Sequence, residues 1–308
     1  MPDTPAQAPD LLPTIGQQLQ HAARTRGQSV AYLEDGVPHT WDQVAAQSAR
    51  LASSLLRLGL KRGDRIGVMG LNQIGWLHLF YAATQLGMGV VGLSVRYRDN
   101  ELLHMLADSQ TAAVFTLSQH EGFDFVAMLD RLAPNLPALR HVFTLDGQGP
   151  GSLAGLMTGP VEPAALANAR SQVGPQDVAM VIYTSGTTGR PKGAGLTHHS
   201  LLASAQAQAA HTRVREGDVL HMGNPLNHVG GITCAVLTHL VGGGTVVLVP
   251  EFKADLMISL MLQHAPTIVA GVPTMLTLLL MNARVDQVDF SGVRIVFSGG
   301  SNVDAVLL

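Results

Sequence analysis

The segment Val181-Ile-Tyr-Thr-Ser-Gly-Thr-Thr-Gly-Arg-Pro-Lys-Gly193 joins an apolar run to a turn that is rich in hydroxyl groups and glycine. Gly186 and Gly189 allow the backbone to bend and to bring its N–H groups close to an anion. The other polar donors of the turn are Thr184, Ser185, Thr187, Thr188 and Lys192. Residues of these types also form ordinary surface turns, but their order after a predicted buried strand favours a site for a chain of phosphates.

This turn is not a Walker A loop. Its end, Gly189-Arg190-Pro191-Lys192, lacks the Gly-Lys-Ser/Thr sequence that would place a hydroxyl group on Mg²⁺. Instead, residues 183–193 resemble the signature loop of the adenylate-forming superfamily, which includes acyl-CoA synthetases, aryl-CoA ligases, luciferases and peptide-synthetase adenylation domains. The resemblance implies that the phosphates of ATP are bound by Thr184, Ser185, Gly186, Thr187, Thr188, Gly189 and Lys192.

The composition is that of a globular protein with large cores. The chain has 308 residues, of which 46% are hydrophobic and 13% are charged, and its length suggests roughly two domains. The net charge of −3 comes without a basic block, so we expect no nucleic-acid partner. The first residues lack a signal-peptide pattern, and no uninterrupted apolar stretch of about 18 residues follows. We therefore expect a cytoplasmic protein without a membrane span.

Helical and strand-like segments alternate along the chain. Thr40 and Gln43 have capping-box spacing, and apolar residues then recur at helical intervals until Gly59. Further helices are predicted at 73–86, 100–107 and 199–210, the last capped by Thr197. Residues 146–173 read as an irregular connection with a short helix near Ala164. Strands are predicted at 65–71, 90–94, 112–116, 178–183, 219–222, 245–249, 267–270 and 293–297.

This alternation predicts an α/β fold of two stacked subdomains, with largely parallel sheets flanked by helices. The approximate subdomains are residues 60–215, with the first sheet and the phosphate loop, and residues 14–59 plus 216–308, with the second sheet.

Other classes of protein fit less well. Gly87-Met-Gly-Val-Val-Gly92 satisfies the dinucleotide pattern G-x-G-x-x-G, but a helix precedes it and a strand follows, which indicates a helix-to-strand turn and leaves a dehydrogenase as a weak alternative. No Gly-x-Ser-x-Gly elbow of a serine hydrolase surrounds Ser94, Ser185, Ser298 or Ser301.

Metal and cysteine chemistry are also weakly supported. The chain has 13 histidines, yet His221, His228, Cys234 and His239 show no zinc-binding spacing, so we expect no metal site. Cys234, the only cysteine, lies in the apolar run Ile232–Leu237 and is predicted to be a buried packing residue.

Two later motifs resemble further parts of the superfamily site. Asn224-Pro-Leu-Asn-His-Val-Gly-Gly231 is similar to the acid-pocket motif, which places His228 beside the carboxylate of the substrate, with Gly230 and Gly231 leaving room for it. Asn227 stands where the family usually has an aromatic residue. The loop 297–301 follows a predicted strand and resembles the loop that lies against adenine and the acyl group. The resemblance therefore assigns this pocket to Ser298, Gly299, Gly300 and Ser301.

Two other segments of the resemblance are interpreted as structural. In Gly271-Val-Pro-Thr274, Pro273 is expected to begin a helix. Residues 94–102 resemble an early family motif and are expected to connect the two subdomains.

The resemblance covers nearly the whole chain, but only the front part of the family architecture. The sequence lacks the aromatic-Gly-x-Thr-Glu motif, the Thr-Gly-Asp motif and the carboxyl-terminal domain with its adenylation lysine, so the catalytic residue itself is not identified. The chain ends in the apolar run Val306-Leu-Leu308. We expect a truncated, split or partial ligase that can associate through an unfinished sheet edge.

The reaction implied by the resemblance is ATP-dependent activation of a carboxylic acid to acyl-AMP, followed by transfer to a thiol. Its co-substrates and cofactors would be ATP, Mg²⁺ and coenzyme A, and the acid would be fatty or otherwise hydrophobic. A luciferase-like oxidation stays open, whereas no aspartate near His228 suits the amino group of an amino acid. The alternative is a non-catalytic nucleotide-binding remnant or one part of a split ligase.

Overall fold

The computed structural model describes residues 11–184 and 190–303, and within them the strands form two six-stranded sheets and one short hairpin. The first sheet has the order β10 (Lys192–Thr197), β9 (Val178–Thr184), β4 (Gly89–Leu93), β3 (Arg65–Met69), β5 (Ala113–Thr116) and β8 (His141–Thr144). The second has the order β14 (Ile295–Ser298), β13 (Ile268–Gly271), β11 (Val219–Met222), β12 (Thr245–Leu248), β1 (Val30–Glu34) and β2 (Val37–Thr40). The hairpin consists of β6 (Gln119–His120) and β7 (Phe123–Asp124).

Both large sheets are mainly parallel. The antiparallel pairs are β9 with β10 in the first sheet and β1 with β2 in the second. Every other pairing within these two sheets is parallel, as expected when helices connect successive strands. The carboxyl ends of the parallel strands therefore gather at one edge of each sheet, where α/β proteins bind their ligands.

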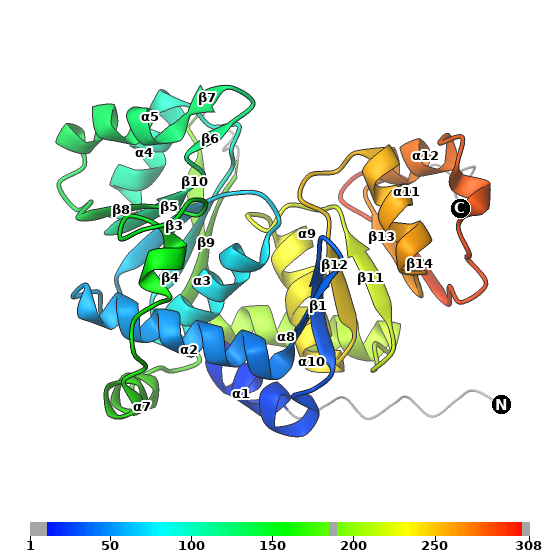
Figure 1. Cartoon of the computed structure of the whole chain (residues 1–308), viewed down its shortest axis with the longest axis horizontal. Coiled ribbons are helices and arrows are strands. Elements are labelled where there is room, and N and C mark those ends of the chain that lie inside the picture. Colours follow the sequence, from blue (N-terminus) through cyan, green and yellow to red (C-terminus); the bar gives the residue numbers. More distant parts are fainter. Residues whose placement is uncertain (1–10, 185–189, 304–308) are drawn as a thin grey trace.

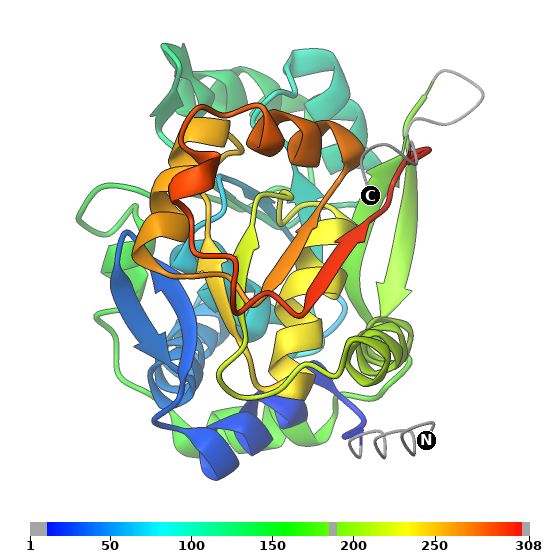
Figure 2. The same ribbon diagram turned by 90° about the vertical axis from the view of Figure 1, so that its right-hand side faces the viewer.

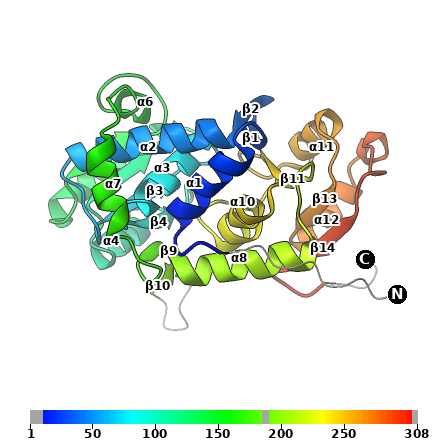
Figure 3. The same ribbon diagram turned by 90° about the horizontal axis from the view of Figure 1, so that it is seen from below.

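Helices lie between the two sheets and on both outer faces (Figures 1 and 2). The outer face of the first sheet carries α4 (Asp99–Asp108) and α5 (Phe125–Leu132), and that of the second carries α11 (Ala254–Gln263) and α12 (Pro273–Leu280). The central layer contains α1 (Ile15–Arg26), α2 (Trp41–Arg57), α3 (Ile74–Thr84), α8 (His198–Thr212) and α10 (Thr238–Gly242). Figure 3 shows α8 running along the underside toward β14, where Arg294 Nη1 donates to the carbonyl of Thr212 over 2.8 Å.

Short elements complete the chain. They are η1 (Ala133–Asn135), α6 (Leu153–Leu156), α7 (Pro163–Ser171), α9 (Val229–Gly231), the π-helical turn η2 (Ile232–Leu237) and η3 (Val285–Gln287). No helix within residues 11–184 and 190–303 has the length and apolar character required to cross a bilayer.

Two cores hold these layers together. The larger joins both sheets to the central helices, and α3 is buried nearly all round because its sequence is apolar on every face. Inside it, the hydroxyl groups of Tyr32 on β1 and Tyr81 on α3 share a buried hydrogen bond of 2.6 Å. The smaller core lies under α11 and α12 and includes Ile258 and Leu276.

The predicted fold class, two largely parallel sheets flanked by helices, is confirmed. Thr40 and Gln43 form the predicted capping box, since each side chain accepts from the backbone N–H of the other. Gly87 has a φ of +70° between α3 and β4, which is the helix-to-strand turn expected in place of a dinucleotide loop. The first-sheet strands lie within 65–197 and the second-sheet strands within 30–40 and 219–298, while the subdomain boundaries stay a prediction.

Of the other local predictions, three are confirmed and one is corrected. The helix near Ala164 is confirmed as α7, Thr197 caps α8, and Pro273 is the first residue of α12. Cys234 is only half-buried, which corrects the expectation of a buried packing residue. It lies in the π-helical turn η2, and burial still raises the pKa of its thiol.

Candidate functional site

A cavity of about 500 Å³ opens where the carboxyl edges of the two sheets meet. The first sheet contributes Tyr183 on β9 and the segments that follow β3 and β4. The second contributes the segments that follow β11 and β12, including His228 and Glu251. His228 of the predicted acid pocket therefore borders the same hollow as Tyr183, which directly precedes Thr184 of the predicted phosphate loop.

Asn72, just after β3, fixes the second-sheet side of this cavity. Its buried side chain donates to the carbonyls of Asn224 over 3.0 Å and Val249 over 2.9 Å, and it accepts from the N–H of Leu226 over 2.9 Å. Its backbone N–H donates to Pro250 over 3.0 Å. Asn72 thus sets the position of the loop that carries His228 relative to the first sheet.

Gly92 on β4 makes a second close contact between the two sides. A side chain at this position would bring its Cβ to 2.9 Å from the Cα of Asn227 and to 3.0 Å from the oxygen of that residue. Only glycine therefore allows the loop 224–228 to lie directly on β4. Asn227, the departure from the family's aromatic residue, rests here with its backbone against the first sheet.

His228 is exposed and begins the short helix α9. Its Nδ1 accepts from the N–H of Gly230 over 3.1 Å, so the ring is oriented by the helix that follows it. Gly231 is buried, and a Cβ there would lie 2.3 Å from the carbonyl oxygen of Pro225. Its missing side chain thus permits the turn of the loop itself, and its role in leaving room for substrate stays a prediction.

Gly230 lines a smaller cavity of about 20 Å³, which shares Gly223 with the main one. Met222, Cys234, Ala270 and Phe297 surround the same space, together with the polar His221 and Asn224. Phe297 directly precedes Ser298, so this cavity lies between the acid-pocket motif and the predicted adenine loop.

The stem of the predicted phosphate loop is the β9–β10 pair, in which Thr184 faces Lys192 across the strands. Both side chains are exposed. Ser185, Gly186, Thr187, Thr188 and Gly189 lie outside the described residues.

The stem is braced by α4. Tyr183 donates its hydroxyl to Asp108 Oδ2 over 2.6 Å and to the carbonyl of Met105 over 3.0 Å. Burial, and next the bond to the Asp108 carboxylate, raise the pKa of Tyr183, so its phenol stays neutral. His104 Nε2 contacts the carbonyl oxygen of Pro191 at 2.9 Å.

The loop after β14 lies at the same edge of the second sheet. Ser298 donates its hydroxyl to the carbonyl of Gly271 over 3.0 Å and thereby ties the loop to β13. Gly300 has a φ of +87°, a conformation that glycine adopts without strain. Gly299, Gly300 and Ser301 are exposed.

The comparison with protein families identifies the chain. A family model described as AMP-binding enzyme matches residues 19–308. The chain belongs to this family. The resemblance inferred from residues 183–193 is therefore confirmed.

Members of the AMP-binding family with curated functions include acid–CoA ligases. The chain is 30% identical to a feruloyl-CoA synthase of Amycolatopsis sp. over 293 residues, covering 95% of this chain and 55% of that protein. It is 28% identical to the long-chain-fatty-acid–CoA ligase FadD13 of Mycobacterium tuberculosis over 296 residues, covering 96% and 56%. The chain thus spans about half the length of these relatives.

Solved structures of the AMP-binding family share the fold. An inhibitor-bound N-terminal domain of FACL13 from Mycobacterium tuberculosis matches with a TM-score of 0.81 and 26% identity, covering 96% of this chain and 72% of that one. A fatty acyl CoA synthetase of the same organism matches with a TM-score of 0.83 and 27% identity, covering 96% and 56%.

Sequence reasoning missed several residues that build the cavity. Asn72 and Gly92 act through contacts with a loop more than a hundred residues away, which no local pattern reveals. Arg96 is 3.5 Å from Glu251 across the cavity, in agreement with the expectation that residues 94–102 connect the two sides. For Asn72, the sequence offered one sign of a structural role: a polar residue between the apolar strand β3 and the apolar helix α3.

Proposed function

We propose that this chain takes part in the ATP-dependent activation of a carboxylic acid, through acyl-AMP, to an acyl-CoA thioester. The observation that carries the proposal is the shared cavity. Tyr183, at the start of the phosphate-loop stem, and His228, in the acid-pocket motif, border the same hollow although they come from different sheets. A reaction between a carboxylate and a phosphate needs these two binding regions side by side.

The chemical problem is the poor reactivity of a carboxylate toward thiols. Attack of the carboxylate oxygen on the α-phosphate of ATP forms an acyl–phosphate bond and releases pyrophosphate. The thiol sulfur then attacks the acyl carbon and AMP leaves. In this scheme Lys192 and Thr184 contribute positive charge and a hydroxyl donor to the phosphates, and His228 lies beside the acid. Asn72 and Gly92 set the distance between the two reactants.

Mg²⁺ would accompany ATP and neutralise phosphate charge. Among the described residues, His120, Glu121 and Glu251 form a group of three that could hold a metal ion, and none of them lies on the β9–β10 stem. Protein ligands for such an ion are therefore not identified, and no step of the scheme above depends on it. Mg²⁺ commonly keeps water and phosphate oxygens as most of its ligands.

We propose a fatty or other hydrophobic acid as substrate. Met222, Ala270 and Phe297 place apolar surface beside Gly230, although the cavity of about 20 Å³ between them is also lined by His221 and Asn224 and is too small for an acyl chain. The names of the relatives agree with this class, since they include a feruloyl-CoA synthase and a long-chain-fatty-acid ligase.

One part of a split ligase is the second candidate. In the described part of the chain, β14 is an edge strand, and Val296 on it is 57% exposed. Nearby, Leu280 and Met281 on and after α12 are 61% and 77% exposed. An open edge and exposed apolar side chains suit association with another polypeptide.

The test is ATP–pyrophosphate exchange by the purified 308-residue chain with aromatic, medium-chain and long-chain acids. Exchange that depends on an acid supports the ligase proposal. Saturable ATP binding without exchange supports a nucleotide-binding remnant or a split ligase, and size-exclusion chromatography with light scattering then tests association. A chain that is folded by circular dichroism but binds no ATP overturns the proposal.

A further inference from the structure

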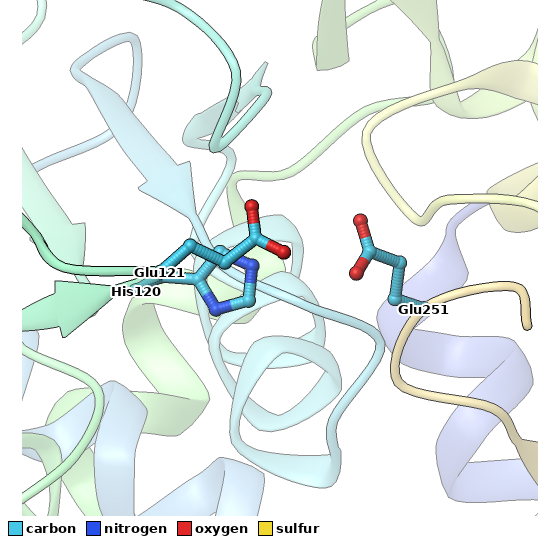
Figure 4. Close-up of side chains that lie close together, drawn as sticks. All are labelled: His120, Glu121 and Glu251. Carbon is cyan, nitrogen blue, oxygen red and sulfur yellow. The ribbon is translucent and has the colours of Figure 1, made fainter.

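Three metal-ligating side chains from two distant segments converge beside the cavity. His120 and Glu121 come from the β6–β7 hairpin, and Glu251 follows β12 (Figure 4). One ligand atom of each side chain lies within 4.8 Å of those of the other two. We propose that His120, Glu121 and Glu251 bind a divalent transition-metal ion that joins the two sides of the cavity rim.

The hairpin holds its two ligands in a defined turn. Glu121 and Gly122, between the paired residues His120 and Phe123, both have positive φ angles of 49° and 77°. Two such residues in succession are typical of the tight turn of a two-residue hairpin. The guanidinium of Arg98 lies 4.1 Å above the ring of Phe123 and holds the hairpin against the segment before α4.

Glu251 is held equally firmly from the other side. It directly follows Pro250, whose carbonyl accepts the backbone N–H of Asn72 over 3.0 Å. The side chain of Asn72 also binds the carbonyl of Val249. Because contacts outside the three residues anchor both segments, the backbone of the site is in place before any ion binds and only side-chain rotamers remain to be ordered.

The two carboxylates of this cluster would be stabilised by a positive charge close to both. Glu121 and Glu251 bring two carboxylates together, and like charges at this distance repel each other. Arg96 lies 3.5 Å from Glu251, but its side chain is 83% exposed, so water weakens the attraction. The Nε2 atom of His120 is shielded from solvent and has no hydrogen-bond partner among the described residues. A bound cation would offset the repulsion between the carboxylates and lie beside the imidazole.

The set of donors selects the kind of ion. One imidazole and two carboxylates suit Zn²⁺, Mn²⁺ or Co²⁺, whereas Mg²⁺ and Ca²⁺ favour sites made of oxygen alone. The site is therefore chemically distinct from that of the Mg²⁺ that accompanies ATP. Three protein ligands leave further coordination positions for water or for a ligand in the cavity, which Glu251 also lines.

The experiment is a titration of the metal-depleted 308-residue chain with Co²⁺, followed by visible absorption, and with Zn²⁺, followed by calorimetry. Neither ATP nor an acid is present, so the outcome does not depend on the proposed ligase activity. We expect one equivalent to bind, and Glu251→Gln and His120→Gln to weaken binding by at least about tenfold. Glu162→Gln, which removes a carboxylate paired with Arg57 elsewhere, should leave binding unchanged.

Two further variants separate the metal site from a structural effect. Arg96→Gln removes the competing cation and is expected to bind the metal at least as tightly as the wild type. Glu121→Gln changes an exposed hairpin residue and should lower metal affinity without changing the thermal melt in chelator. Absence of one-to-one binding by the wild-type chain, or binding that Glu251→Gln and His120→Gln leave intact, overturns the proposal.

Discussion

The side-chain amide of Asn72 donates a hydrogen bond of 3.0 Å to the backbone carbonyl of Asn224, and it thereby joins the segment after β3 to the loop that carries His228. The same side chain binds Val249 and Leu226, so one residue of the first-sheet side holds two segments of the second. This buried amide therefore helps to set the width of the cavity, together with the close contact between Gly92 and Asn227.

Asn72→Ala is expected to destabilise the chain and to loosen this loop. The substitution leaves the carbonyls of Asn224 and Val249 and the N–H of Leu226 without a partner, and each buried unpaired group costs about 1–3 kcal/mol. Urea unfolding followed by circular dichroism measures the loss. The matched control is Asn100→Ala, at an exposed position in the first turn of α4, which should change stability by less than about 0.5 kcal/mol. Equal stability of the two variants would contradict the role assigned to Asn72.

Gly92→Ala should disturb the contact between β4 and the loop that carries His228, because it adds a methyl group where the two backbones touch. A Cβ at this position meets the backbone of Asn227 at 2.9 and 3.0 Å, and backbone cannot move aside as a flexible side chain can. Overpacking of this kind costs about 1–3 kcal/mol. We expect lower stability and reduced acid-dependent pyrophosphate exchange.

The control for Gly92→Ala is Gly89→Ala on the same strand. Its Cβ would have an ordinary contact of 3.4 Å with the carbonyl of Val178. The two variants add the same methyl group to β4, so a difference between them reports on the close contacts of Gly92, which are the rigid backbone of Asn227 and the flexible end of Met180. Equal losses of stability and activity in both variants would remove those contacts from the explanation.

Local patterns predicted the elements of this fold well and the contacts of the site poorly. The capping box at Thr40, the turn at Gly87 and the proline that starts α12 are each encoded within a few residues, and each is present. The alternation of strands and helices was enough to indicate parallel sheets. Strands β1, β2, β8 and β10, the β6–β7 hairpin and helices α1, α5 and α11 were not predicted, and of these strands only β1 has more than one buried residue.

The cavity, in contrast, depends on pairs that are distant in sequence. Asn72 with Asn224, Gly92 with Asn227, and His120 with Glu251 meet only because the carboxyl edges of the two sheets face each other. A sequence shows that a glycine or an asparagine is present, but which residue it contacts is known only from the tertiary structure. The same limit applies to Gly231, whose close contact with the backbone of Pro225 follows from the path of the loop and not from the motif.

Buried histidines should make the stability of the chain depend on pH. Desolvation lowers the pKa of His78 to about 3 and those of His198, His221 and His239 to about 4. In the unfolded chain the imidazole pKa is about 6.5. The unfolded state therefore binds more protons than the folded state between these values, and stability, complete above about pH 6.5, falls as the pH drops toward 4.

The expected loss between pH 7 and pH 5 is on the order of 1–2 kcal/mol for each buried histidine. Urea unfolding at pH 7, 6 and 5 measures it. His198→Asn provides an internal comparison, because asparagine can still accept the N–H of Ile15, which now binds His198 Nδ1 over 3.1 Å, but cannot titrate. Its stability should fall less steeply with pH, whereas parallel pH profiles would exclude His198 from the effect.

Lys192→Ala tests the stem of the phosphate loop. Lys192 is exposed and faces Thr184 across β9 and β10, where its charge is available to an anionic ligand and contributes little to the core. We expect ATP affinity to fall by about tenfold or more, since a charge-assisted hydrogen bond is lost, while the urea midpoint stays within error. Calorimetric titration with ATP gives the affinity. Lys61→Ala, which removes another exposed lysine remote from this stem, controls for net charge. Equal ATP affinity in both variants would show that the β9–β10 stem does not hold the nucleotide.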